Sequence, residues 1–345
     1  MGAYLEDTIE LVECHAAGEV GHVIVAGVPA PPGDTLWEQS RWIAADGRLR
    51  NRVLNEPRGG VYQHVNLLVP PISPQAQYGY IIMEPEDTPP MSGSNTICVA
   101  TVLLERGLLP MTEPQTQFTL EAPGGLVSIV ADCRAGRVTR VSLFNVASFA
   151  DRLDVPVEVD GLGTIVVDTA YGGDSFAVVS ARDLGFDLRP DEARELCEVG
   201  GRIRSAVQEQ CGFQHPDNAD IGGISFCLFA GPTALEDGLP TSRNATIVRP
   251  GKVDRSPTGT GLSARMALMH ARGQLGVGES LRTRSIIDSE FTGRIEEAVN
   301  LRDRTAIIPR VAGRAWVTGR RELFGINDDP WPEGYRLSDT WPRMP

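Results

Sequence analysis

Short runs of β-branched and aromatic residues, separated by turns that contain glycine or proline, dominate this chain of 345 residues. Such runs predict strands, which we expect at 8–13, 22–28, 61–69, 78–83, 117–130, 138–146, 164–168, 175–180, 224–230 and 245–249. Apolar residues recur at helical spacing in 35–46, 95–107, 191–209 and 260–274. The pattern includes antiparallel hairpins and lacks regular β–α–β alternation, so it predicts an α+β fold and disfavours a doubly wound parallel sheet.

The chain carries an internal repeat at an offset of 166 residues. At this offset Ser92-Gly93-Ser94 falls on Thr258-Gly259-Thr260, and Arg106-Gly107 falls on Arg272-Gly273. Each copy reads as a strand, a proline-containing loop, a hydroxyl–glycine–hydroxyl turn and a helix ended by Arg-Gly. The repeat and the length, at about 150 residues per domain, predict two related domains. We expect 1–148, joined by 322–345, to form the first domain and 149–321 the second.

Both copies of the repeat place a hydroxyl residue, Ser92 or Thr258, at the expected start of a helix. The backbone N–H groups that follow have no acceptor within a helix, and the helix dipole adds to their attraction for an anion such as a carboxylate. These binding groups belong to Gly93, Ser94, Gly259 and Thr260. If both helix ends face one cleft, the two hydroxyls flank a ligand on opposite faces, which suits proton transfer beside a carboxylate. The alternative is that each hydroxyl is an ordinary N-cap.

Composition and charge restrict the classes of binding partner and cofactor that the protein is expected to use. A formal net charge of −13 argues against nucleic acid or an anionic membrane, because both repel an acidic surface. No apolar run approaches the ~18 residues of a membrane span and no signal segment opens the chain, so we expect a cytoplasmic protein. The six cysteines lie far apart, so reduced thiols and no metal site are expected. Lys252 is the only lysine, so any Schiff-base chemistry would depend on it alone.

Two segments resemble the signatures of the proline racemase superfamily. They are MSGSNTICVATVLLERG at 91–107 and VDRSPTGTGLSARMALMHARG at 253–273. In that family the segments usually read M-C-G-H-x-(S/T)-I and D-R-S-P-C-G-T-G. Other similar stretches are ECHAAGEVGHVIVAGV at 13–28, EPRGG at 56–60, AYGGDSFAVVSA at 170–181 and HPDNADIGGISF at 215–226. The resemblance covers most of residues 10–320.

The resemblance implies a fold and a type of active site. It implies two similar α+β domains, each with strands wrapped around a central helix as in diaminopimelate epimerase, and an active site in the cleft between them that needs no cofactor. In the family's racemases and hydroxyproline epimerases, one cysteine per domain acts on each face of the α-carbon. Those positions match Ser92 and Thr258, so both cysteines are missing here. The implied ligand is a small imino acid with a carboxylate, and related enzymes are often dimers.

The missing cysteines change the expected chemistry. A thiol whose pKa is lowered at a helix N-terminus is a workable base, whereas a threonine hydroxyl is a poor proton shuttle. Family members with threonine at the second position resemble trans-3-hydroxy-L-proline dehydratases, which remove the α-proton and expel the 3-hydroxyl to give Δ1-pyrroline-2-carboxylate. We therefore expect a cofactor-independent hydro-lyase of amino-acid catabolism. Ser92, directly or through a water, is then the base, and Thr258 orients the leaving hydroxyl or a water.

Two alternatives stay open. Dehydratases of this kind usually keep cysteine at the first position, and the family histidine two residues further on is Ser94 here. Some related epimerases pair a serine with a cysteine, so an epimerase or racemase of hydroxyproline or proline is the first alternative. The second is a catalytically silent protein that binds imino acids through the two helix ends. Cys98, six residues into the helix, is not expected to replace the missing thiol.

Three further residues are candidate ligand contacts. Asp254 matches the family aspartate that contacts the ring nitrogen of the substrate, where a carboxylate holds the ammonium form and acidifies the α-carbon. His215 is a candidate to line the site, although a lone histidine is more often structural. Asp174, in the Gly-Gly-Asp segment, is a weaker candidate of the same kind.

Overall fold

The computed structural model describes residues 8–325 and 328–342, which form two compact units. The first unit contains 8–143 and 313–342, and the second contains 144–312. The chain therefore passes from one unit to the other at 143/144 and 312/313. The sequence predicts these boundaries at 148/149 and 321/322. The parts of the predicted domains at 1–7, 326–327 and 343–345 lie outside the described residues.

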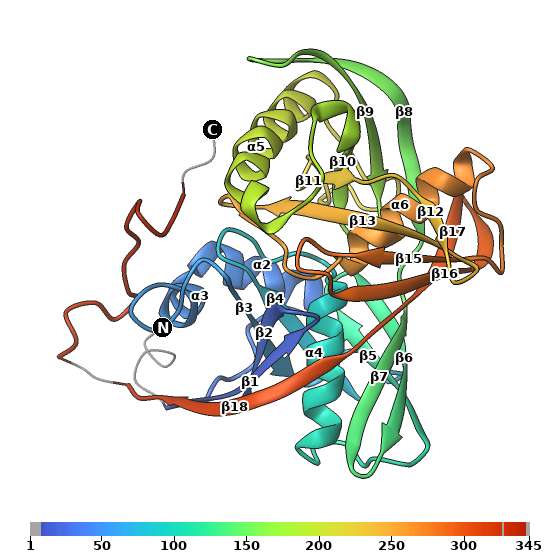
Figure 1. The fold of residues 1–345 in the computed structure, drawn as a ribbon. Coiled ribbons are helices and arrows are strands. Elements are labelled where there is room, and N and C mark those ends of the chain that lie inside the picture. The colour runs from blue at the N-terminus through green and yellow to red at the C-terminus, as the bar shows by residue number, and fades with distance from the viewer. Residues whose placement is uncertain (1–7, 326–327, 343–345) are drawn as a thin grey trace. The chain divides into compact units, whose positions relative to one another are not determined.

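The first unit is a mixed sheet whose strands surround helix α4 (Figure 1). The strand order is β18–β1–β2–β3–β4–β5–β6, with β2–β3 and β4–β5 parallel and the other pairs antiparallel. Its elements are β1 (Ile9–Ala16), β2 (Glu19–Ala26), α2 (Leu36–Asp46), α3 (Arg48–Leu54), β3 (Gln63–Val69), β4 (Tyr78–Met83), α4 (Gly93–Glu105), β5 (Gln115–Ala122), β6 (Gly125–Arg134), β7 (Arg137–Phe144) and β18 (Ala315–Leu323).

In the second unit the strands close on themselves around helix α6. The order is β8–β9–β10–β11–β13–β15–β16–β17, and β17 pairs back with β8 through Ala306 opposite Phe149. Its elements are β8 (Ser148–Val159), β9 (Gly163–Tyr171), β10 (Ser175–Ser180), α5 (Ala193–Gln210), β11 (Phe226–Ala230), β12 (Ala234–Glu236), β13 (Leu239–Val248), β14 (Lys252–Val253), α6 (Gly259–Ala271), β15 (Ser280–Arg284), β16 (Glu290–Leu301) and β17 (Arg304–Gly313), with short 3-10 turns at Arg182–Leu184 and Pro190–Glu192.

The two units repeat one topology, which confirms the duplication. From β1 and from β9 onward, both sheets run antiparallel, parallel, antiparallel, parallel, antiparallel. Helices α4 and α6 occupy the same place in this order, and both are 13 residues long at the predicted offset. Arg106 and Arg272 are their C-caps, each followed by a glycine with positive φ, as the Arg-Gly endings predict.

Each unit has its central helix inside the sheet and other helices outside it. Every residue of α4 from Gly93 to Leu104 is buried, because small and apolar side chains on all sides allow the strands to enclose it. In α6, Ala264 and Leu268 pack in the same way against Phe176 and Leu228. The outer helices are amphipathic and cover the other face of each sheet: α2 and α3 in the first unit, α5 in the second.

The sequence places most elements correctly and misplaces some bounds. The run at 117–130 is wrong as one strand, because Pro123-Gly124 turns the chain between β5 and β6. Helix α4 covers 93–105, against the predicted 95–107, since its first turn begins directly after Ser92. Helix α3 and the strands β8, β12, β14 and β15–β18 were not predicted.

Candidate active site

Ser92 and Thr258 are the N-caps of α4 and α6, but neither side chain caps its helix. The ordinary-cap interpretation is therefore wrong for both hydroxyls. Among the described residues, no acceptor bonds the first N–H groups of the two helices, which belong to Gly93, Ser94, Gly259 and Thr260. The N-terminal end of each helix, here called its mouth, thus has unbonded donors and the positive end of the helix dipole. That these donors bind an anionic group stays a prediction. That the two mouths share one cleft stays a prediction.

In the first unit an amide chain holds the Ser92 hydroxyl. Asn66 Nδ2 donates to the carbonyl oxygen of His22 (3.2 Å), which can only accept, so the orientation of the Asn66 amide is fixed. The same Nδ2 donates to Asn95 Oδ1 (2.8 Å), and this leaves Asn95 Nδ2 facing Ser92 Oγ at 2.9 Å. Ser92 Oγ is therefore an acceptor toward Asn95. Its own hydrogen can point to Ser94 Oγ, 3.4 Å away, or to a ligand.

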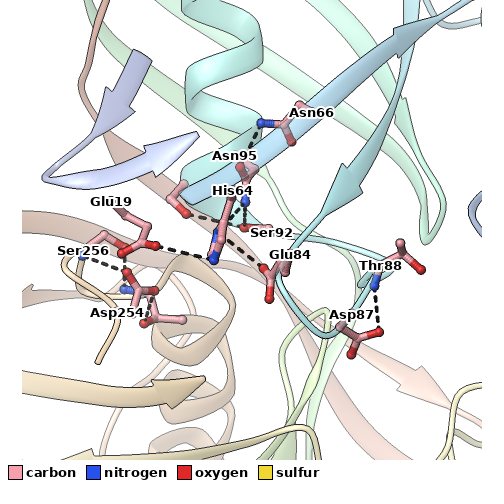
Figure 2. Close-up of polar contacts among 12 residues, drawn as sticks. Glu19, His64, Asn66, Glu84, Asp87, Thr88, Ser92, Asn95, Asp254 and Ser256 are labelled. Carbon is pink, nitrogen blue, oxygen red and sulfur yellow. Dashed lines mark hydrogen bonds and ion pairs between the residues drawn. The ribbon is translucent and has the colours of Figure 1, made fainter. Parts of the chain in front are cut away.

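A buried histidine between two carboxylates adjoins this chain (Figure 2). His64 Nε2 lies 3.5 Å from Glu19 Oε1, and His64 Nδ1 lies 3.6 Å from Glu84 Oε1. Asn95 Nδ2 is 3.3 Å from the same Nδ1. All three side chains are buried, so the polar contacts among them replace contacts with water. Sequence reasoning missed this group, although polar His64 and Glu84 within and after apolar strand runs are a signal for it.

In the second unit the candidates Asp254 and Thr258 are brought together. Thr258 Oγ1 donates to Asp254 Oδ2 at 2.6 Å, and Ser256 N donates to the other carboxylate oxygen at 2.8 Å. Thr258 N in turn donates to Ser256 Oγ at 3.1 Å. Both side chains are buried. Figure 2 shows Asp254 and Ser256 in this turn.

The other two candidates lie in different surroundings. His215 packs edge-on against Tyr171 and Phe149, with ring centroids 4.7 and 5.6 Å apart, and its Nδ1 accepts from Asp217 N. Burial lowers the pKa of His215, so the ring is neutral near pH 7. It makes no hydrogen bond or ion pair with Asp254 or Thr258, and its contact with substrate stays a prediction. Asp174 is buried, with Oδ1 accepting from Ser175 N.

Cys98 does not have the properties of a replacement base. It is fully buried inside α4, and burial together with the neighbouring Cys14 raises the pKa of its thiol well above the usual range. A thiol in this state is not ionised at neutral pH and is a poor nucleophile or base.

We expect Cys98→Ala to keep turnover within about threefold of the wild type, which is less than 1 kcal/mol of activation barrier. Steady-state kinetics with the substrate proposed below measures this. Cys133→Ala, which removes another buried thiol on β6, is the matched control for general destabilisation. A loss of about 100-fold confined to Cys98→Ala would show that this thiol takes part in the reaction.

Residues 8–325 and 328–342 contain neither a candidate metal site nor a helix that could span a membrane. In that part of the chain, no group of three or more His, Cys, Asp or Glu side chains is arranged to hold a metal ion. No helix there is long and apolar enough to cross a membrane.

The fold and the paired helix mouths define a class of protein: two repeated α+β units, each with strands around one central helix. A phenazine biosynthesis protein of the PhzF family from Bacillus anthracis shares this fold (TM-score 0.57, 14% identity, 92% of this chain and 99% of that chain). The particular family follows from the sequence: the model of the Proline racemase family matches residues 11–336, and the chain belongs to that family.

Two solved structures are similar over nearly the whole length. One is a hydroxyproline epimerase from Agrobacterium vitis with bound trans-4-hydroxy-L-proline, at 38% identity and a TM-score of 0.91, covering 97% of both chains. The other is a probable proline racemase from Agrobacterium radiobacter with bound carbonate, at 37% identity and a TM-score of 0.92, covering 97% of this chain and 98% of that chain. The chain thus belongs to an enzyme family whose members include proline racemases and hydroxyproline epimerases.

Proposed function

We propose that this member of the family is a hydro-lyase that converts trans-3-hydroxy-L-proline to Δ1-pyrroline-2-carboxylate. The observation that carries the proposal is the chemistry of the two helix mouths, where hydroxyls replace both family thiols and Thr258 is bonded to Asp254 at 2.6 Å. Inversion at the α-carbon needs a group on each face that can hold and return a proton. Dehydration needs one proton acceptor and a group that assists the departing hydroxyl, which two alcohols and a carboxylate can supply.

In the proposed complex, unbonded helix N–H groups bind the substrate carboxylate. The donors of Gly93, Ser94, Gly259 and Thr260 have the right chemistry, since an anion at a helix N-terminus meets both the N–H groups and the dipole. Asp254 contacts the ring nitrogen, as the family resemblance implies. A carboxylate has about four lone-pair positions, so the bonds from Ser256 and Thr258 are compatible with this contact.

The reaction needs no outside oxidant or reductant. The α-carbon loses its proton, the electron pair of that bond forms a double bond to C3, and the bond from C3 to the hydroxyl oxygen breaks. The hydroxide takes up a proton and leaves as water. The enamine then tautomerises to Δ1-pyrroline-2-carboxylate. We place this step in cytoplasmic amino-acid catabolism, require no cofactor for it, and expect the enzyme to be a homodimer.

Epimerisation of hydroxyproline is the second candidate. Its support is the similarity, at 38% identity over 97% of the chain, to the Agrobacterium vitis hydroxyproline epimerase. Against it stand the hydroxyls at both acid–base positions. A protein that only binds imino acids would share the helix mouths and lack either reaction.

The test is an assay of the purified protein in deuterium oxide with trans-3-hydroxy-L-proline, trans-4-hydroxy-L-proline and L-proline. We expect pyrroline product, trapped with o-aminobenzaldehyde or seen by NMR, from the first compound only. No product from trans-3-hydroxy-L-proline would end the dehydratase proposal. Inverted 4-hydroxyproline carrying α-deuterium would establish the epimerase, and binding without any reaction would establish the third alternative.

A further inference from the structure

The two candidate hydroxyls use their hydrogens in opposite ways. Thr258 has one hydroxyl hydrogen, and it is donated to Asp254 Oδ2 at 2.6 Å. Within the part of the chain that the structure describes, no group donates to Thr258 Oγ1. Toward a ligand Thr258 therefore presents lone pairs, so it can accept a proton or a hydrogen bond.

The bond between Thr258 and Asp254 has the geometry of a proton-transfer pair. A separation of 2.6 Å lies in the range of charge-assisted O–H···O⁻ bonds, about 2.5–2.7 Å. The carboxylate cannot turn away, because Ser256 N donates to its second oxygen, and Ser256 Oγ also accepts from Thr258 N. Acceptor and hydroxyl are thus fixed in one buried turn.

The backbone of Thr258 supports a functional reason for this turn. Its φ of 61° and ψ of 102° lie where β-branched residues are rare, so this backbone conformation is strained. An ordinary N-cap has extended backbone, as Ser92 does with φ −149° and ψ 123°. The strained conformation coincides with the side-chain bond to Asp254 at the mouth of α6.

Ser92 has the opposite arrangement: its hydroxyl accepts a hydrogen bond from the protein and keeps its hydrogen for a ligand. The amide chain from Asn66 through Asn95 fixes Asn95 Nδ2 as the donor to Ser92 Oγ at 2.9 Å. One lone pair of Ser92 is therefore engaged, and no carboxylate or carbonyl among the described residues takes its hydrogen. Ser92 is set to donate toward a ligand, and it has no base in hydrogen-bond contact that would remove its proton.

From these opposite polarities we propose that Thr258, with Asp254 behind it, removes the α-proton, and that Ser92 donates a hydrogen bond to the departing hydroxyl. The inference rests on the proposed dehydration and reverses the roles that the sequence alone suggests. Thr258 Oγ1 takes the α-proton while its own proton moves to Asp254 Oδ2. The electron pair forms the double bond to C3, and hydroxide leaves against Ser92. Asp254 returns its proton through Thr258, and hydroxide becomes water.

The test compares four variants, Asp254→Asn, Thr258→Val, Thr258→Ser and Ser92→Ala, in deuterium oxide. Two rates are measured: dehydration of trans-3-hydroxy-L-proline, and exchange of the α-proton in recovered trans-3- and trans-4-hydroxy-L-proline. Asp254 takes up the proton that Thr258 passes on, so Asp254→Asn should lower kcat by about 10²–10⁴-fold, the usual contribution of acid–base catalysis. KM should rise as well, because Asp254 also contacts the ring nitrogen in the proposed complex. Thr258→Val should match Asp254→Asn in both rates.

The matched controls separate chemistry from folding. Thr258→Ser keeps the hydroxyl and should retain kcat within about tenfold, one step of 1.36 kcal/mol in barrier. Ser92→Ala should lose dehydration but keep α-proton exchange, because this variant still has the proposed base, Thr258 with Asp254. Circular dichroism and thermal melting report whether each variant folds, and Thr258→Val keeps the test decisive if Asp254→Asn does not fold.

The opposite pattern would overturn the inference: exchange abolished in Ser92→Ala, with Asp254→Asn keeping kcat and raising only KM. Failure of the proposed function gives a different result. A wild-type protein that exchanges or inverts trans-4-hydroxy-L-proline without dehydration refutes the dehydratase, and the same variants still identify the base through exchange. A wild-type protein with neither reaction overturns both proposals.

Discussion

Thr258→Cys is expected to add inversion of trans-4-hydroxy-L-proline to the reactions of this protein. The change places a thiol at the position that the family signature D-R-S-P-C-G gives to cysteine, and the serine–cysteine pairing with Ser92 then resembles that of related epimerases. A thiol gives up its proton far more readily than an alcohol and can hold and return one. Removing the β-branch also suits a backbone with φ of 61° better than threonine does.

We expect α-proton exchange in trans-4-hydroxy-L-proline to rise about 100-fold over wild type, the lower end of what a positioned acid–base group contributes. Chiral chromatography of the product and NMR of the α-position in deuterium oxide measure it. Thr258→Ser is the control, because it removes the same methyl group without supplying a thiol. If Thr258→Cys is no more active than Thr258→Ser, the pocket and not the hydroxyl forbids inversion.

The internal repeat shows what sequence could predict about this fold. Matching the turn at Ser92 with that at Thr258 gave two related units, and the structure repeats the same strand order around two helices of equal length. The Arg-Gly endings were predictable because glycine after a helix adopts a left-handed backbone. Local chemistry, spacing and the similarity of the halves determine these features, and all of them can be read along the chain.

The strands that complete the second unit were not predictable in the same way. Strand β17 is needed to close the ring through its pairing with β8, and its register with β16 shifts between Ile295 and Glu297. Such a bulge interrupts the alternation of apolar and polar positions from which a strand is recognised. The paired residues Ala306 and Phe149 lie 157 positions apart in sequence (306 − 149), so no local signal connects them.

The candidate site also has parts that the sequence could predict and parts that it could not. Helix mouths and the residues of the repeat were predictable, because each lies within a few positions of a turn signal. The direction of each hydrogen bond was not: it depends on Asn66, from another strand, and on a turn that brings Asp254 to Thr258. His64, Glu19 and Glu84 come from three separate segments, so only folding reveals them as one group.

Gly172→Ala is expected to disrupt the mouth of α6 from outside the helix. A Cβ at this position would lie 2.1 Å from the carbonyl oxygen of Thr260 and 2.5 Å from the backbone nitrogen of Ala264, so backbone must move. Asn145 also links Gly172 to the start of α6, since its Nδ2 donates to both the Gly172 carbonyl (2.7 Å) and Ser263 Oγ (2.9 Å). The displaced first turn of α6 would carry Thr258 with it.

We expect this overpacking to cost about 3 kcal/mol of unfolding free energy, the upper end of its usual range. A displacement of about 1 Å at the site would lower turnover about 100-fold in the protein that remains folded. Chemical denaturation and kinetics below the melting transition measure the two effects separately. Gly276→Ala is the matched control, because its Cβ would meet only the flexible Glu279 side chain at 3.4 Å, and it should change stability by no more than about 0.5 kcal/mol. Wild-type stability and turnover in Gly172→Ala would show that α6 is not held by this contact, and the geometry of Thr258 would then have to depend on its own turn with Asp254 and Ser256.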